Sequence, residues 1–127
     1  MTRRIIFSLL ALTALASGPA HAEWEYVASS DFYARYIDPD SASRDGDIVR
    51  IWEVDDQAAE DRFGVRSLRA RTEYDCSDRA YRIVHLSGHS KPLTGGRVIF
   101  SRPGQEDWSP VAPGTLGEAT LDRICED

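Results

Sequence analysis

The stretch Ser67-Leu-Arg-Ala-Arg-Thr-Glu-Tyr-Asp-Cys76 decides the fold, because its residues alternate in character with a period of two. The residues of one parity are uncharged and mostly apolar: Leu68, Ala70, Thr72 and Tyr74. The residues of the other parity are polar: Ser67, Arg69, Arg71 and Glu73. A strand with one apolar and one polar side is typical of an antiparallel sheet that covers a core with one face only. We therefore predict a half-solvated antiparallel strand over Gly64–Tyr74.

Similar patterns lie on both sides of this strand. Short runs rich in aromatic or β-branched residues predict further strands at Trp24–Ala28, Asp31–Ile37, Ile48–Val54, Ala80–Leu86 and Arg97–Ser101. The run Ile48–Val54 is partly apolar on both sides, which favours a central strand. Turn-forming residues separate the strands at Asp38-Pro39-Asp40, Asp45-Gly46 and Cys76-Ser77-Asp78. Asp55–Phe63 and Ser87–Gly95 are expected to be loops, the first with an optional short helical turn.

The end of the chain changes to a helical pattern. Thr115 and Glu118 have the T-x-x-E spacing of a capping box, and apolar residues follow at helical spacing as far as Cys125. The sequence therefore predicts an α+β fold, with an antiparallel β-sheet of about five or six strands and one C-terminal α-helix.

The first 22 of the 127 residues resemble a secretory signal peptide. Arg3 and Arg4 precede the apolar run Ile5–Leu15, and Ala20-His21-Ala22 is an A-x-A cleavage site. The apolar run is short for a membrane span of about 20 residues, so an uncleaved anchor or a buried helix is the weaker alternative. We expect a single domain over 23–127 in the periplasm or the external medium. Because no cysteine lies near the cleavage site, we expect no lipid anchor. After cleavage of the signal peptide we expect no stable membrane insertion.

The chain has two cysteines, Cys76 and Cys125, and both lie in the exported part. Only one disulfide can join them, and an oxidising compartment favours its formation. A redox pair and half of a zinc site are the alternatives. The two cysteines are 49 positions apart. This separation is unlike the C-x-x-C motif of redox pairs or the close ligand spacing of zinc sites. We therefore predict a structural disulfide.

The charge is unevenly distributed. The chain has 15 basic and 21 acidic residues, a formal net charge of −6, which argues against nucleic acid as a partner. Between Arg62 and Arg102, however, nine basic residues stand against three acidic ones. A candidate interaction surface for an acidic partner comprises Arg69, Arg71, Arg82, Lys91 and Arg97, with His89 beside them. The alternative is an ordinary solvent face whose arginines pair with the abundant carboxylates.

Catalytic chemistry has little support in the sequence. No serine lies in a nucleophile-elbow motif, and no base and orienting group accompany one. His85 and His89 are four residues apart, but they lie in a strand and turn context without further ligands, so a metal or haem site is the weaker alternative. The acidic pairs Asp55-Asp56 and Glu60-Asp61 lack the glycine-punctuated ligand series of a calcium loop. We expect no enzyme and no cofactor.

An ordered set of residues resembles the surface-adhesin protein E family of Gram-negative bacteria. The set comprises Trp24, Ile37-Asp38 with Ser41, Gly46, Val49–Trp52, Glu73–Cys76, Tyr81-Arg82, Trp108, Val111, Pro113–Thr115 and Cys125. The resemblance spans nearly all of 24–125. It implies a small antiparallel sheet with a C-terminal helix held by the disulfide, and adhesion to host matrix proteins such as vitronectin and laminin.

These observations together predict an exported, non-catalytic binding module with a protein partner in the envelope or the host matrix. The alternative is a periplasmic carrier or sensor of a small ligand, because a curved sheet with a helix often encloses a pocket. An exposed edge strand can pair two copies, so we expect a monomer or a weak homodimer.

Overall fold

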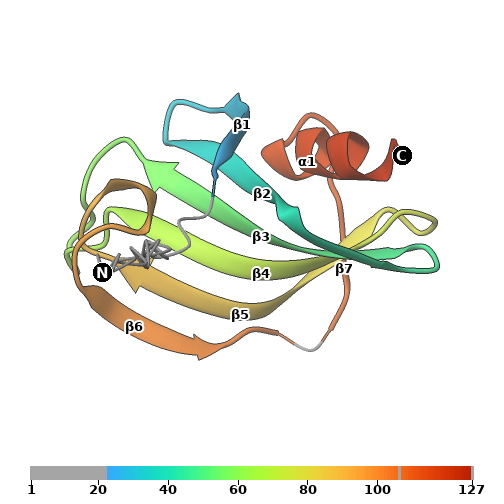
Figure 1. Ribbon diagram of the computed structural model, residues 1–127. Helices are drawn as coiled ribbons and strands as arrows, with labels where there is room; N and C mark the ends of the chain where they lie inside the picture. Colours follow the sequence, from blue (N-terminus) through green and yellow to red (C-terminus); the bar gives the residue numbers. More distant parts are fainter. Residues whose placement is uncertain (1–22, 106, 127) are drawn as a thin grey trace, which may run out of the picture.

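The computed structural model describes residues 23–105 and 107–126; the predicted signal peptide lies outside these ranges. One antiparallel sheet runs in the order β1-β2-β3-β4-β5-β6, and the short β7 also pairs with β5. The strands are β1 (Glu25–Ser29), β2 (Tyr33–Asp45), β3 (Ile48–Gln57), β4 (Ser67–Asp75), β5 (Ala80–His89), β6 (Val98–Pro103) and β7 (Ser109–Pro110). A single α-helix, α1 (Leu116–Cys125), follows them and lies over one face of the curved sheet beside β1 (Figure 1). The predicted fold class is confirmed.

The alternation in β4 assigns the two faces of the sheet. Tyr74 is 1% exposed and forms the core cluster with Ile37, Ile51 and Leu121, the last of which belongs to α1. The face that carries these residues is called the helix-facing side below. The other face, which carries Arg69 and the other polar residues of β4, is called the outer face.

The predicted helix begins and ends where the sequence indicates. The hydroxyl of Thr115 accepts a hydrogen bond from the Glu118 amide at 3.2 Å, and the Glu118 carboxylate accepts one from the Gly114 amide at 3.3 Å. The first bond satisfies one of the backbone donors that a helix start leaves without partners, and the second holds Gly114, the residue before the N-cap Thr115. At the other end, Cys125 forms the predicted disulfide with Cys76, so that α1 is joined covalently to the end of β4.

The predicted turn at Asp38-Pro39-Asp40 is wrong. β2 continues through these residues, and its pairing with β3 is interrupted by a bulge between Asp38 and Ser43. The hydroxyl of Ser41 donates to the Asp38 carbonyl at 2.7 Å and accepts from the Trp52 amide at 2.9 Å. Because this one side chain replaces the missing ladder contacts, the strand resumes after its proline.

The expected loop over Ser87–Gly95 is also too long. β5 continues to His89, and Pro92–Thr94 forms a short 3₁₀ helix within the connection to β6. Gly88 permits the extension, because a β-carbon there would lie 2.4 Å from the ring of Phe100 on β6. Likewise, β3 extends to Gln57, so that the start of the expected polar loop at Asp55 belongs to the sheet.

Removal of the disulfide by Cys76→Ser/Cys125→Ser is expected to lower the free energy of unfolding by about 4 kcal/mol, the chain-entropy value for a loop of this length. Urea unfolding of the oxidised protein and of the double variant measures the difference. Reductant should destabilise the parent chain and leave the variant unchanged. Equal stability of the oxidised and reduced parent would contradict this role of the disulfide.

Candidate functional site

The outer face carries an aromatic and cationic cluster at its centre. Trp52 on β3 lies opposite Arg71 on β4, and Arg69 is the next residue along β4 on the same face. The guanidinium carbon of Arg69 lies 3.9 Å from the Trp52 ring centroid, and that of Arg71 lies 5.6 Å from it. His85 meets the same indole edge-on, with 6.5 Å between ring centroids. Two cations therefore share one indole, an arrangement that cation–π attraction favours.

Arg69 and Arg71 have no carboxylate within ion-pairing distance among the described residues. The Nε atom of Arg69 is buried and lacks a hydrogen-bond partner within the same part of the chain. Burial lowers the pKa of Arg69, and the charge of Asp38 only partly opposes this effect. The cluster of Trp52, Arg69 and Arg71, called the Trp52 cluster below, thus presents positive charge that the described structure does not neutralise locally.

The other three residues of the predicted surface lie toward the two ends of β5, on either side of the Trp52 cluster. Arg82 on β5 pairs with Glu73 at 3.1 Å and stacks over Trp108 at 4.6 Å. Lys91 and Arg97 belong to the connection between β5 and β6, at the opposite end of β5. Since β5 has 10 residues, these two ends are about 30 Å apart. Arg82 is thus paired with a carboxylate, as an ordinary solvent face would have it, whereas Arg69 and Arg71 form no ion pair within the described part of the chain.

The two histidines have separate hydrogen-bond partners on the outer face. A ring nitrogen of His85 lies 2.9 Å from the Ser101 hydroxyl, and one of His89 lies 2.8 Å from the Ser87 hydroxyl. Burial, together with the positive charge of Arg69, lowers the pKa of His89. In the part of the chain that the structure describes, no three His, Cys, Asp or Glu side chains are grouped as a metal site would require.

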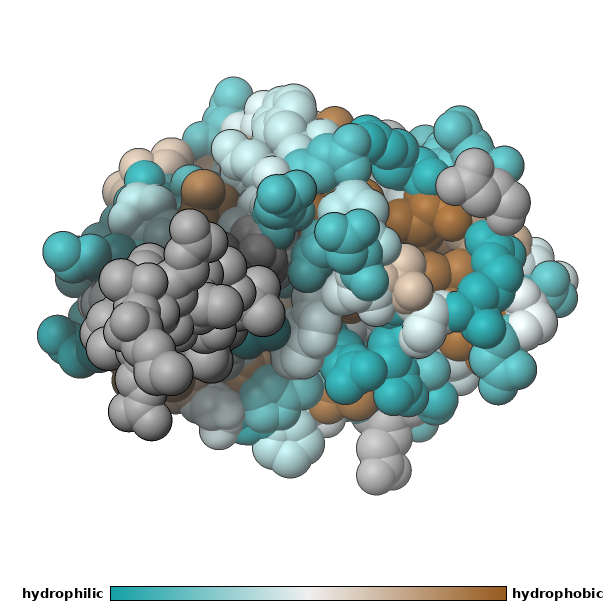
Figure 2. Space-filling view, in the orientation of Figure 1, coloured by the Kyte–Doolittle hydropathy of each residue, from teal (hydrophilic) through white to brown (hydrophobic). Residues whose placement is uncertain are grey.

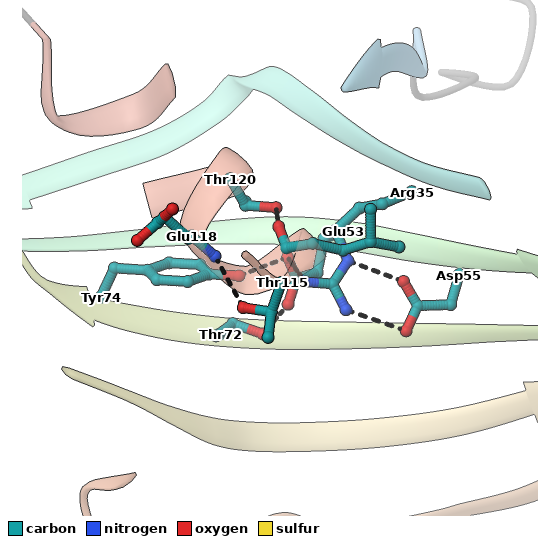
Figure 3. Close-up of polar contacts among 9 residues, drawn as sticks. Arg35, Glu53, Asp55, Thr72, Tyr74, Thr115, Glu118 and Thr120 are labelled. Atoms are coloured by element: carbon teal, nitrogen blue, oxygen red, sulfur yellow. Dashed lines mark hydrogen bonds and ion pairs between the residues drawn. The ribbon is translucent and has the colours of Figure 1, made fainter. Parts of the chain in front are cut away.

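A buried charged network occupies the helix-facing side, and the sequence analysis did not anticipate it. Arg35 on β2 donates from Nε and from a terminal nitrogen to the two oxygens of Asp55 at 2.7 and 3.1 Å. The oxygens of Glu53 accept from the hydroxyls of Thr72 at 2.6 Å and Tyr74 at 2.7 Å. A further ion pair of 3.8 Å joins Arg35 to Glu53. Figure 3 shows these side chains converging from neighbouring strands.

Burial and charge act together in this network. Burial alone would lower the pKa of Arg35, but the charge of Glu53 and the hydrogen bonds and charge of Asp55 outweigh it, so the pKa lies above its ordinary value. Burial raises the pKa of Tyr74 well above its ordinary value, and the neighbouring Glu53 carboxylate raises it further. The arginine and the phenol therefore keep their protons at neutral pH.

The network forms the floor of a cavity of about 370 Å³ between the sheet and the segment that leads into α1. Strand residues line it from below, and Pro110–Ala112 with Thr115–Gly117 line it from above. In Figure 2, apolar side chains appear between hydrophilic ones below α1, where this segment crosses the sheet. The helix and the sheet are therefore not packed solidly against each other along their whole length.

One signal in the sequence could have revealed the network. Glu53 has the same parity as the buried Val49 and Ile51, so the alternation of β3 places a carboxylate on the core side. A charge at a core position requires a buried partner, and Arg35 has the core-side parity in β2. The acidic pair Asp55-Asp56, which lacks a calcium ligand series, forms ion pairs instead: Asp55 pairs with Arg35, and Asp56 pairs with Arg66 at 3.1 Å.

The sequence of the chain also matches a known protein family. The family model described as surface-adhesin protein E matches residues 24–126. The chain belongs to the surface-adhesin protein E family. This family implies an exported protein, and its description is that of an adhesin and not of an enzyme. No curated protein matches the chain in sequence.

Crystal structures of Haemophilus influenzae protein E share the fold. The protein in crystal form II is 19% identical in sequence to this member of the surface-adhesin protein E family. The two structures match with a TM-score of 0.60 over 72% of this chain and 79% of that one. The protein from non-typeable Haemophilus influenzae is 17% identical with a TM-score of 0.55, over 84% of this chain and 79% of that one. None of the described helices is long and apolar enough to cross a membrane.

Replacement of Tyr74 by Phe is expected to lower the free energy of unfolding by roughly 2 kcal/mol at neutral pH, because Glu53 loses a buried hydrogen-bond donor. Above about pH 10 the unfolded chain releases the Tyr74 proton while the folded chain retains it, so stability falls as the pH rises. In Tyr74→Phe the free energy of unfolding should fall less steeply as the pH rises. Part of the fall should remain in this variant, because burial also raises the pKa of Tyr33.

Urea unfolding at a series of pH values measures both effects. Tyr26→Phe is the matched control, because the Tyr26 side chain is exposed and its hydroxyl donates to the nearby, exposed Ser29 and not to a buried carboxylate. An alkaline slope that is the same in Tyr74→Phe and in the parent chain would contradict the assignment.

Proposed function

We propose that this chain is an exported, non-catalytic binding module whose Trp52 cluster engages an acidic segment of a protein partner in the envelope or the host matrix. Membership in the surface-adhesin protein E family supports an adhesive role and export. The Trp52 cluster supports the choice of the outer face, because α1 covers the opposite side of the sheet.

The observation that carries the proposal is the stacking of Arg69 and Arg71 on one indole, with no carboxylate paired to either of them in residues 23–105 and 107–126. Contact with the indole restricts the two side chains, so less side-chain entropy is lost when they bind. A guanidinium edge donates two parallel hydrogen bonds to a carboxylate. Tryptophan and arginine are also among the residues that most often dominate interface energies.

The surroundings of the cluster favour an acidic partner over a neutral one. Glu73 and Asp75 are the carboxylates of β4 with the parity of the outer face. Glu73 already pairs with Arg82 and with Arg50, the latter at 3.5 Å, and Asp75 accepts from the amides of Ser77 and Asp78 at the turn after β4. Because Glu73 is taken up in this way, it does not compete for Arg69 and Arg71. The excess of basic residues between Arg62 and Arg102 adds a long-range attraction for acidic surfaces that salt should weaken.

Reversal of the cluster charge tests the proposal. The variant Arg69→Glu/Arg71→Glu should bind immobilised vitronectin, laminin or poly-L-glutamate about tenfold more weakly or worse, because like charges then face each other. Surface plasmon resonance at two salt concentrations measures the affinity, and the parent chain should bind more weakly at the higher one.

Arg62→Glu/Arg102→Glu is the matched control. It makes the same change in net charge and also removes two arginines stacked on aromatic rings, those of Phe63 and Phe100, outside the Trp52 cluster. The control should retain most of the parent affinity. Equal losses in the two double variants, or no binding of the parent chain to any of the three surfaces, would contradict the proposal.

A further inference from the structure

We propose that the cavity beneath the segment leading into α1 is a binding site for a small organic cation, a protonated amine with a compact apolar body. This site lies on the helix-facing side and is independent of the Trp52 cluster. The inference goes beyond the binding of a protein partner, and it rests on the charge, the aromatic lining and the size of the cavity.

The charge of the floor favours a cation. The ionisable acids and bases that line the cavity, other than tyrosines, are Arg35, Glu53 and Asp55, so two carboxylates face one guanidinium. Arg35 is paired with both carboxylates, since both oxygens of Asp55 accept from it and an oxygen of Glu53 lies 3.8 Å from its guanidinium group. An incoming anion would compete with this pairing, whereas an ammonium group would neutralise the remaining negative charge.

Aromatic rings surround the same space. Tyr33, Tyr74 and Tyr81 all line the cavity, and the rings of Tyr74 and Tyr81 are 6.5 Å apart. The faces of tyrosine rings attract cations, and this attraction strengthens where water is excluded. The Tyr74 hydroxyl already donates to Glu53, so it holds the carboxylate in place and leaves its negative charge unchanged.

The remaining lining matches an apolar body. Aliphatic side chains from β4, β5 and the covering segment complete the walls: Leu68, Ala70, Ile83, Leu86, Val111 and Leu116. At about 370 Å³ the cavity lies near the lower end of the range for small-molecule sites, about 300 to 1,000 Å³. In an amine with about six carbon atoms, the ammonium group can contact the carboxylates of the floor while the aliphatic chain packs against these walls.

A purely structural role explains the network less well. Apolar side chains of similar volume often stabilise a fold as much as a buried ion pair or more, because the pair must lose its hydration. Here the pair is flanked by a second carboxylate and by open space, which core packing would ordinarily fill. The roof is thin, since Pro110, Ala112 and Thr115 are exposed, so a ligand has a short path from solvent.

Hexylammonium is the probe, and hexan-1-ol and hexanoate are its neutral and anionic counterparts of similar size. Isothermal titration calorimetry with the exported chain at neutral pH should give saturable one-to-one binding of hexylammonium at millimolar concentration or below. Neither counterpart should bind comparably. Absence of saturable hexylammonium binding, or equal binding of hexan-1-ol or hexanoate, overturns the proposal.

Two variants locate the site. Asp55→Asn removes one negative charge from the floor and should weaken hexylammonium binding about tenfold, and Ala112→Trp should block the cavity from its exposed roof. Asp45→Asn, in the exposed hairpin between β2 and β3, is the charge-matched control and should bind as the parent does. Thermal unfolding identifies any variant that fails to fold. Binding at the parent affinity by either folded cavity variant overturns the proposal, and Ala112→Trp decides alone if Asp55→Asn does not fold.

Discussion

The side chain of Tyr74 links the two parts of the helix-facing side. Its ring packs in the apolar core with Ile37, Ile51 and Leu121, and its hydroxyl donates to Glu53 in the charged network. A carboxylate next to an aliphatic core would be costly without such a donor. Because one residue serves both parts, the apolar packing of α1 and the positions of the buried charges depend on each other.

The length of α1 determines how much of the sheet remains uncovered. Ten residues of α-helix span about 15 Å, which is less than half the extended length of a strand such as β2 with 13 residues. The disulfide joins the end of α1 to the end of β4, and an ion pair between Arg123 and Glu25 joins it to β1. The helix is thus fixed over one end of the sheet, and the cavity lies beside its first turn, where the helix no longer fills the space.

The individual strands, the helix cap and the disulfide could be predicted because each depends on residues close together or on a simple count. Alternation predicted β4, the spacing of Thr115 and Glu118 predicted the start of α1, and two cysteines allow one pairing. The bulge in β2 could not be predicted in this way, since it depends on the Ser41 hydroxyl reaching the Trp52 amide on another strand. The charged network escaped notice for a related reason: Arg35 and Glu53 are 18 positions apart, and strand register alone brings them together.

The same alternation that places Tyr74 in the core also places Arg69 and Arg71 on the outer face, so the two proposed sites share β4 but use opposite sides of it. They have opposite charge requirements, since the outer face presents guanidinium groups and the cavity floor has one carboxylate in excess. A single layer of backbone separates them, and this favours independent binding over competition. A one-residue slip of β4 against β3 would exchange the two sides and bury arginines in the core. The buried bonds from Thr72 and Tyr74 to Glu53 therefore also help to fix the register on which both sites depend.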